Sequence, residues 1–184
     1  MLKALYPLLC NKDHPLVKLI LTFFSVLLLD QVTKYLVQTG MGLYASIPII
    51  GQVLKLTYIR NPGAAFGISV GNRFVFIALS ILACAVMVYY FLRMPREEVW
   101  GRFALTLIFG GAIGNLIDRL LYGEVTDFIE IGVAGYYWPV FNVADMAVTI
   151  GVILLFIRMS SERQTAPHDQ LSEPSKHQSG RTAE

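Results

Sequence analysis

The chain has 184 residues, of which 55% are hydrophobic and only 15% are charged. This composition is far more apolar than that of a soluble domain of the same length. The formal net charge of +2 is too small to suggest a nucleic-acid-binding protein. The two cysteines, Cys10 and Cys84, have no framework spacing, and Cys84 stands within an apolar run, so no disulfide is expected.

Four apolar stretches predict four transmembrane helices, at residues 16–37, 74–92, 103–121 and 140–157. The second stretch contains 19 residues without a charge. That length suffices to cross a hydrocarbon layer of ~30 Å at ~1.5 Å per residue. The first stretch lacks a small-residue cleavage site and is longer than the apolar region of a typical secretory signal, so we interpret it as a span.

Two longer segments connect the spans on one side of the membrane. The first, residues 40–72, is too polar to cross it, and residues 52–59 alternate apolar and polar side chains in the manner of a strand. Neighbouring Gly and Pro residues indicate turns, so we predict a small β-sheet at the outer leaflet, formed from this first outer segment. The second outer segment, residues 123–139, carries amphipathic rings that favour the headgroup boundary, at Tyr136, Tyr137 and Trp138.

The distribution of basic residues predicts the orientation of the chain. Eight basic residues flank the spans on the side of the termini, and five lie on the other side. Since positive charge is retained in the cytoplasm, we expect both termini there. Residues 1–159 would then form the membrane domain, and residues 160–184 a disordered cytoplasmic tail.

This topology gathers polar side chains at the outer leaflet, although they are far apart in the sequence. The set is Asp30, Lys34, Asn61, Asn115, Asp118, Arg119, Asp127, Asn142 and Asp145. Spacings of three residues place Asn115 with Asp118 on one helix face and Asn142 with Asp145 on another. A small-x-x-x-small pair in the third span, Gly110 and Gly114, predicts close helix packing that would bring Asn115 toward the fourth helix.

Asp127 and Asp145 are the strongest functional candidates in this set. Ionisable groups at membrane depth are unfavourable unless they are paired, hydrated or functional, and no neighbour in sequence offers either aspartate an obvious cation. Arg119 could still pair with one of them. Two carboxylates in a poorly hydrated site hold one proton between them and can activate water without a metal. For Asp30 and Lys34 a structural ion pair is an equally good interpretation.

Elimination also favours carboxylate chemistry. All three histidines fall in the predicted cytoplasmic ends, at His14, His168 and His177. This excludes a Ser-His or Cys-His nucleophile, and a zinc site with His or Cys ligands, at the outer leaflet. No metal or cofactor is expected.

Other functions remain open at this stage. A Ser-Lys pair could use Ser46 or Ser69 with Lys34 or Lys55. A small transporter or channel subunit could use the intramembrane carboxylates as an ion path, although these crowd one end of the spans. A presenilin-type protease is a weaker alternative because its Gly-x-Gly-Asp helix motif is absent.

Four motifs match a known family in order along the chain. They are Asn61-Pro62-Gly63-Ala64-Ala65-Phe66, Gly114-Asn115-Leu116-Ile117-Asp118-Arg119, Val125-Thr126-Asp127-Phe128 and Phe141-Asn142-Val143-Ala144-Asp145. Together with Asp30-Gln31 and Lys34 in the first span, they resemble lipoprotein signal peptidase (signal peptidase II) over about residues 16–158.

The resemblance implies an aspartyl endopeptidase of the bacterial inner membrane. It would cleave the signal peptide of diacylglyceryl-modified prolipoproteins on the amino side of the lipidated cysteine. Asp127 and Asp145 match the family's catalytic pair by position. Substrate-binding or dyad-supporting roles fall to Asn61, Asn115, Arg119 and Asn142, and structural or supporting roles to Asp30, Lys34, Asp118, Gly63 and Phe66. We further expect a monomer that contacts membrane lipids and binds peptide-like inhibitors of the globomycin type.

Overall fold

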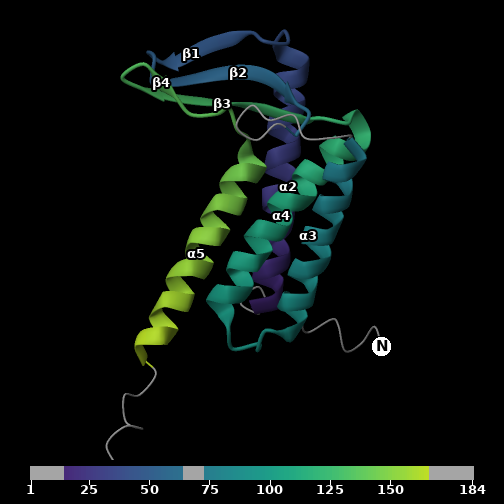
Figure 1. Ribbon diagram of the computed structural model, residues 1–184, viewed down its shortest axis with the longest axis vertical. Helices are drawn as coiled ribbons and strands as arrows, with labels where there is room; N and C mark the ends of the chain where they lie inside the picture. Colours follow the sequence, from purple (N-terminus) through teal and green to yellow (C-terminus); the bar gives the residue numbers. More distant parts are fainter. Residues whose placement is uncertain (1–14, 64–72, 166–184) are drawn as a thin grey trace, which may run out of the picture.

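Four long helices stand side by side, and a small sheet covers one end of them (Figure 1). This computed structural model describes residues 15–63 and 73–165, with side chains up to residue 160. The helices are α2 (Pro15–Gly40), α3 (Arg73–Arg93), α4 (Val99–Tyr122) and α5 (Val143–Thr165). Each is long and apolar enough to cross a membrane, which confirms the four predicted spans.

α4 begins at Val99 and not at the predicted residue 103. The helix α5 differs from its predicted boundaries at both ends. It begins at Val143 and not at residue 140, because the side chain of Asn142 caps its first turn. It also continues to Thr165, past the predicted end at residue 157 and into the segment predicted to be a disordered tail. The remainder of that tail lies outside the described residues.

α4 is the central helix of the bundle and packs against α2, α3 and α5. In the 18-residue apolar stretch of α4, 50% of the residues are buried, compared with 6% in the corresponding stretch of α3. Glycines make the close packing possible: a Cβ atom at Gly110 would lie 3.2 Å from Val26 of α2, and one at Gly111 would lie 2.3 Å from the Ala144 carbonyl oxygen of α5. The close packing predicted from the glycine pair is therefore present, and Gly111 extends it to α5.

The sheet has four antiparallel strands in the order β1-β2-β3-β4. They are β1 (Ser46–Ile50), β2 (Leu54–Asn61), β3 (Val125–Val133) and β4 (Tyr136–Tyr137). The prediction of a sheet at this end of the helices is confirmed, but its origin in the first outer segment alone is wrong. The second outer segment contributes β3 and β4, so Asn61 and Asp127 lie on paired strands and not in loops.

A small hydrophobic cluster holds the sheet over the helix ends. Its buried members are Val37 of α2, Tyr58 of β2 and Phe128 of β3, and Val143 of α5 packs against them. Because the cluster joins two helices to two strands, it fixes the height of β2 and β3 above the bundle. This contact determines where Asp127 lies relative to α4 and α5.

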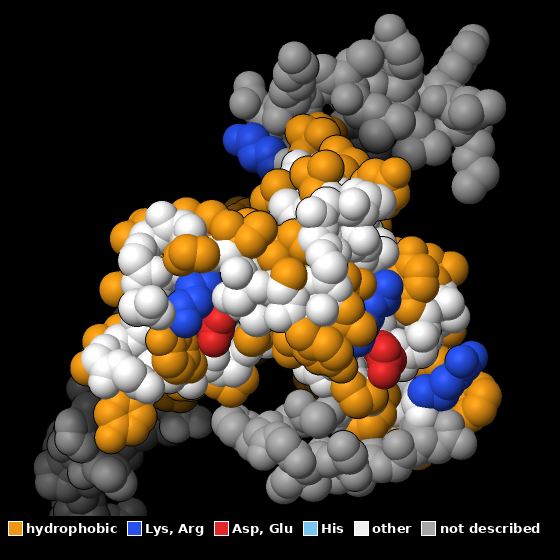
Figure 2. Space-filling model, turned by 90° about the horizontal axis from the view of Figure 1, so that it is seen from above, with side chains coloured by type: hydrophobic (Ala, Val, Ile, Leu, Met, Phe, Trp, Pro, Cys, Tyr) orange, Lys and Arg blue, Asp and Glu red, His pale blue; other side chains and the backbone are white. Residues whose placement is uncertain are grey.

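The face of the sheet away from the bundle is open and carries polar side chains, since Ser46 contacts Thr57 and Thr57 donates to Glu130 there. Figure 2 shows hydrophobic side chains over much of the described surface on this side, with charged side chains in a few separate patches. Ile49, Ile50 and Trp138 are all exposed, and Tyr136 is 84% exposed. Exposed aliphatic and aromatic side chains at the end of a helix bundle are typical of a surface at the membrane boundary.

Candidate active site

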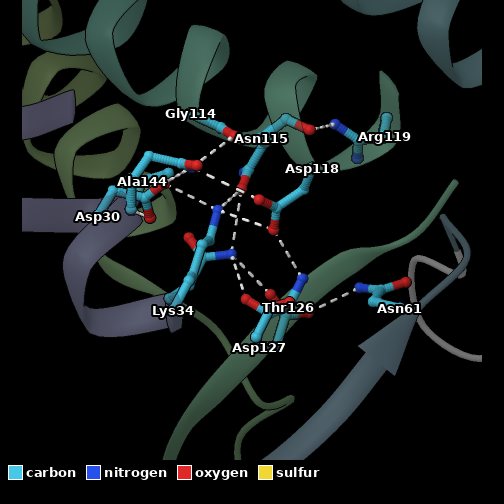
Figure 3. Close-up of polar contacts among 12 residues, drawn as sticks. Asp30, Lys34, Asn61, Gly114, Asn115, Asp118, Arg119, Thr126, Asp127 and Ala144 are labelled. Atoms are coloured by element: carbon cyan, nitrogen blue, oxygen red, sulfur yellow. Dashed lines mark hydrogen bonds and ion pairs between the residues drawn. The ribbon is translucent and has the colours of Figure 1, made fainter. Parts of the chain in front are cut away.

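The predicted polar residues meet beneath the sheet, where β2 and β3 lie over α2, α4 and α5 (Figure 3). The close-up shows residues from all of these elements, joined by hydrogen bonds and ion pairs. The residues brought together are Asp30, Lys34, Asn61, Asn115, Asp118, Asp127, Asn142 and Asp145. Segments more than 100 residues apart in sequence contribute to this network, since the backbone N–H of Ala144 donates to the Asp30 carboxylate over a separation of 114 residues.

Asp127 is almost fully buried, with 2% of its side chain exposed, and both of its carboxylate oxygens accept hydrogen bonds. Asn61 Nδ2 donates to Oδ2 at 2.9 Å, and Asn142 Nδ2 donates to Oδ1 at 2.7 Å. Ile59 is the cross-strand partner of Asp127. Asn61, two residues further along β2, is therefore its diagonal neighbour on the same face of the sheet.

The Asn61 amide is oriented by the turn that follows β2. The backbone N–H of Gly63 donates to Asn61 Oδ1 at 2.9 Å, which leaves Nδ2 to face Asp127. Gly63 has a φ of +106°, a conformation that favours glycine, and a Cβ atom there would collide with the Phe76 ring at 2.5 Å. Gly63 thus orients the Asn61 amide through this turn, while Phe66 lies outside the described residues.

Asp145 is held by the first turn of α5. Its Oδ2 accepts from the backbone N–H of Asn142 at 3.1 Å, and its own N–H donates to Asn142 Oδ1 at 2.9 Å. This reciprocal arrangement is a capping box, in which the N-cap residue and the third helical residue satisfy each other's backbone donors. Asp145 is partly exposed, in contrast to Asp127.

Two asparagine amides connect the carboxylates. Asn142 Oδ1 is committed to the helix cap, so its Nδ2 must face acceptors: Asp127 Oδ1 and, at 3.1 Å, Asn115 Oδ1. Asn115 Oδ1 thus accepts, and its Nδ2 donates to Asp145 Oδ1 at 2.8 Å. The orientation of each amide follows from its neighbours, and the chain Asp127–Asn142–Asn115–Asp145 is continuous.

A buried ammonium group contacts this hydrogen-bonded network at Asn115. Lys34 is 1% exposed, and its Nζ lies 2.8 Å from Asp30 Oδ2 and 3.3 Å from Asp118 Oδ2. It also donates to Asn115 Oδ1 at 2.8 Å. The predicted Asp30–Lys34 ion pair is present, and Asp118 joins it. One lysine is thus the shared cation of two buried carboxylates, and it also fixes the Asn115 amide.

Burial is the main reason why the pKa of Asp127 is raised to about 6. The negative charge of Asp145 raises it further, which shows that the two carboxylates interact electrostatically. The amide donors of Asn61 and Asn142 and the charge of Lys34 act in the opposite direction, because they favour the ionised carboxylate. Asp127 therefore holds a proton more readily than an ordinary aspartate does.

Arg119 lies at the edge of the network and does not form an ion pair with either aspartate among the described contacts. Its Nη1 lies 3.4 Å from Ser80 Oγ and 3.5 Å from the Asn115 carbonyl oxygen. Figure 3 shows its guanidinium joined to the Asn115 carbonyl oxygen, with no drawn contact to Lys34 or Asp118. The pairing of Arg119 with Asp127 or Asp145, which the sequence left open, is not among the described contacts.

Several supporting groups were not predicted as site residues. Asp118 Oδ2 accepts from the Thr126 backbone N–H at 2.9 Å, and Gln38 Nε2 donates to Thr126 Oγ1 at 2.8 Å. Gln31 Nε2 contacts Asp30 Oδ2 at 3.1 Å. Thr126 and Gln31 are adjacent in sequence to the predicted site residues Asp127 and Asp30, and this adjacency was the signal that could have identified them. Gln38 had none, because its contact joins residues that are 88 apart in sequence.

An apolar pocket opens beside Asp145. It has a volume of about 530 Å³, and its walls are formed by β3, the following segment and one face of α5. The lining residues are Ile131, Trp138, Phe141, Asp145, Met146, Thr149 and Ile150. A pocket that is apolar apart from one carboxylate is suited to a hydrophobic ligand with a reactive polar group at one end.

The Ser-Lys alternative finds no support in the described residues. The Ser46 hydroxyl lies 2.8 Å from Thr57 Oγ1, on the sheet. Lys55 donates to the Tyr137 hydroxyl, and Lys34 is surrounded by carboxylates and an amide. Ser69 lies outside the described residues.

The four membrane-spanning helices define a multi-pass membrane protein with a cluster of buried carboxylates beneath its sheet, and comparisons with known proteins identify its family. The family model for signal peptidase (SPase) II matches residues 22–161. The lipoprotein signal peptidase of Syntrophus aciditrophicus (strain SB) is 38% identical over 155 residues, which cover 82% of this chain and 96% of the relative. That of Staphylococcus aureus (strain JH9) is 42% identical over 140 residues, covering 76% and 86%.

Solved structures agree with these sequence matches. One, described as a bacterial membrane enzyme determined by the in meso method at 2.3 Å resolution, superposes with a TM-score of 0.77 at 38% identity, and covers 84% of this chain and 94% of its own. A second, at 1.9 Å, gives a TM-score of 0.72 at 42% identity, covering 77% and 92%. The chain belongs to the signal peptidase II family. It is a multi-pass membrane peptidase that cleaves signal peptides from prolipoproteins, and not a transporter or channel subunit.

Proposed function

We propose that Asp127 and Asp145 are the catalytic pair of this peptidase and activate a water molecule for cleavage on the amino side of a diacylglyceryl-modified cysteine. The observation that carries the proposal is the hydrogen-bonded chain Asp127–Asn142–Asn115–Asp145, which holds two carboxylates in one site beside an apolar pocket. Paired carboxylates with different environments can divide acid and base roles at neutral pH.

The two environments suggest which aspartate holds the proton. Asp127 is the more buried carboxylate, and its pKa is raised to about 6. Asp145 accepts a backbone N–H in the first turn of α5, where the helix dipole favours negative charge. We therefore assign the shared proton to Asp127 and the ionised, base role to Asp145. Asp145 is also the member that lines the pocket through which substrate and water would arrive.

The reaction then proceeds in two steps. Asp145 removes a proton from water as the water oxygen attacks the scissile carbonyl carbon, while Asp127 donates a hydrogen bond to the carbonyl oxygen. The tetrahedral intermediate collapses, the carbon–nitrogen bond breaks, and the proton held by Asp145 passes to the leaving amine. Asn115 and Asn142 keep both carboxylates in place, and Asn61 supports Asp127.

The apolar pocket would receive the lipid of the substrate. Its aliphatic and aromatic wall adjoins α5, a membrane-spanning helix, so an acyl chain could enter from the bilayer while the modified cysteine remains near Asp145. Peptide-like inhibitors of the globomycin type would place a hydroxyl group between the carboxylates. We place the protein as a monomer in the bacterial inner membrane, with the site near the outer leaflet and both termini in the cytoplasm.

The test uses purified full-length protein and a lipidated prolipoprotein. Asp127→Asn and Asp145→Asn should each abolish processing, because a neutral amide cannot exchange a proton with water. The unlipidated substrate should be cleaved poorly by the wild type, since it leaves the apolar pocket empty.

The matched control is Asp118→Asn, which removes a buried carboxylate that contacts Lys34 and Thr126 but neither catalytic candidate. It should lower stability and keep measurable activity. Rapid processing by either Asp127→Asn or Asp145→Asn would refute the dyad, and equal cleavage of lipidated and unlipidated substrates would refute the assignment of the pocket.

A further inference from the structure

A second pocket lies at the end of the bundle opposite the sheet, far from the catalytic candidates. It has a volume of about 320 Å³ and is formed where α3 ends, α4 begins and α5 approaches its C-terminus. Its lining residues are Tyr90, Arg93, Met94, Pro95, Glu98 and Arg158. The proposed peptidase reaction uses none of them.

The charges in this pocket are arranged for an anion. Arg158 forms an ion pair with Glu98, which holds its guanidinium at the wall and offsets its charge. Arg93, the last residue of α3, is exposed and lies over the Tyr89 ring, with 5.3 Å between the guanidinium carbon and the ring centroid. The pocket thus retains one positive charge. Among the described lining residues Glu98 is the carboxylate, and it is already paired with Arg158.

The pocket lies at the boundary between hydrocarbon and headgroups. α3 has 21 residues between Arg73 and Arg93, so at ~1.5 Å per residue it just crosses a hydrocarbon layer of ~30 Å, with one arginine at each end. Arg158 falls near the end of the span Val143–Ser160. Leu92 precedes Arg93, and Phe156 lies close to Arg158 in sequence. These two apolar side chains are 76% and 72% exposed. Lipid chains therefore have apolar surface available beside the pocket.

We propose that this pocket binds the phosphodiester headgroup of an anionic membrane phospholipid. The guanidinium of Arg93 contacts the phosphate oxygens, as arginine forks do, and the Tyr90 hydroxyl supplies a further donor. The acyl chains lie along the exposed apolar residues of α3 and α5. Basic pockets between membrane helices are known to take such headgroups, and arginine suits phosphate better than a mobile lysine does.

The experiment measures phospholipid binding to the full-length protein in neutral detergent, by native mass spectrometry across a titration of phosphatidylglycerol or phosphatidylcholine. Wild type should bind phosphatidylglycerol more tightly. Arg93→Gln should weaken this binding by about five- to tenfold, as expected for one arginine near an anionic lipid. Arg93→Lys should restore part of the affinity, and prolipoprotein processing by Arg93→Gln should be unchanged, which shows that the variant is folded.

Arg96→Gln is the matched control, because Arg96 is exposed in the same loop but does not line the pocket. It should change the affinity less than twofold if the pocket, and not diffuse positive charge, holds the lipid. Equal losses in Arg93→Gln and Arg96→Gln would overturn the proposal, as would equal binding of the two lipids by wild type. Displacement of phosphatidylglycerol by millimolar inorganic phosphate would assign the pocket to the free anion and also overturn it.

Discussion

Lys34 acts at the residue scale on both the stability and the geometry of the site. Its ammonium group is the countercharge for Asp30 and Asp118, which are 0% and 1% exposed, and it is also the donor that fixes the Asn115 amide. Removing one partner of a buried ion pair leaves an uncompensated charge and is far more destabilising than loss of an exposed pair. The lysine is therefore linked to Asp145 through the Asn115 amide, which accepts from Lys34 and donates to Asp145.

Lys34→Met should lower the free energy of unfolding by about 3–5 kcal/mol, measured by thermal unfolding in detergent, and should abolish processing. The double variant Asp30→Asn/Lys34→Met removes one of the two unpaired carboxylates, so part of the stability should return while activity stays low. Lys55→Met is the control, since Lys55 donates only to the Tyr137 hydroxyl on the sheet surface. A wild-type unfolding temperature for Lys34→Met would contradict this account.

The raised pKa of Asp127 predicts a pH dependence with a definite sign. Asp127 is protonated below about pH 6. If it must hold the proton for catalysis, kcat/KM should fall as pH rises through this value, because that ratio reports the free enzyme. In Asn61→Leu the ionised form loses a donor, so the descending limb should move to higher pH by about one unit.

Gln38→Leu controls for the loss of a nearby amide, since Gln38 contacts Thr126 and neither carboxylate. Its pH profile should match that of the wild type. An activity that instead rises through pH 6 would show that ionised Asp127 is the base and would reverse the two roles.

At the scale of the elements, the contact between α4 and α5 places the two asparagines together. A Cβ atom at Gly111 would lie 2.3 Å from the Ala144 carbonyl oxygen, and the backbone of Ala144 cannot retreat easily because its N–H is bonded to Asp30. Gly111→Ala should therefore separate the helices, lower stability by about 1–3 kcal/mol and reduce processing. Gly42→Ala, where a Cβ atom meets nothing within 4 Å, should do neither. Thermal unfolding and the processing assay of both variants check this, and equal stabilities would refute it.

The helices could be predicted from the sequence because membrane spans carry their signal in composition. The start of α5 could not be placed by hydropathy, since residues 140 and 141 are as apolar as the helix that follows. The capping pattern Asn142-x-x-Asp145 was in the sequence and marks the boundary correctly. β3 was missed as a strand because its first four residues show no apolar–polar alternation, although residues 129–133 do alternate.

The site residues were predictable as a set, but their connections were not. Motifs identified Asn115 and Asn142, and topology placed them at one end of the helices. The contact between Lys34 and Asn115 joins residues that are 81 apart, and depends on the rotation of two helices about their axes. Periodicity shows which residues share a face of one helix, but it does not show which face meets which neighbour.

At the scale of the whole molecule, the structure strengthens the argument for orientation. Of the basic residues at the sheet end, Lys34 is buried among carboxylates and Arg119 lies at the edge of the site, so neither belongs to a loop. Arg93, Arg96 and Arg102 at the other end are in or beside a short connection, where positive charge acts on topology. The difference in loop positive charge between the two ends of the bundle is thus larger than a count of all basic residues indicates.

Cysteine labelling checks this orientation in a background of Cys10→Ser and Cys84→Ala. Gln52→Cys, in the exposed turn between β1 and β2, should react with a membrane-impermeant maleimide in intact cells. Arg96→Cys, at the opposite end, should react only after the membrane is permeabilised. The reverse pattern would place the sheet in the cytoplasm.

The capping box at Asn142 and Asp145 has a consequence for drug resistance. The carboxylate that an inhibitor would engage at Asp145 also accepts the Asn142 N–H at the start of a membrane helix, so a substitution that weakens inhibitor binding there also removes a cap contact worth about 1 kcal/mol. Resistance substitutions at Asp145 are therefore unfavourable. Resistance should arise instead along the apolar wall, at Met146 or Ile150, where side chains vary in size without loss of a cap.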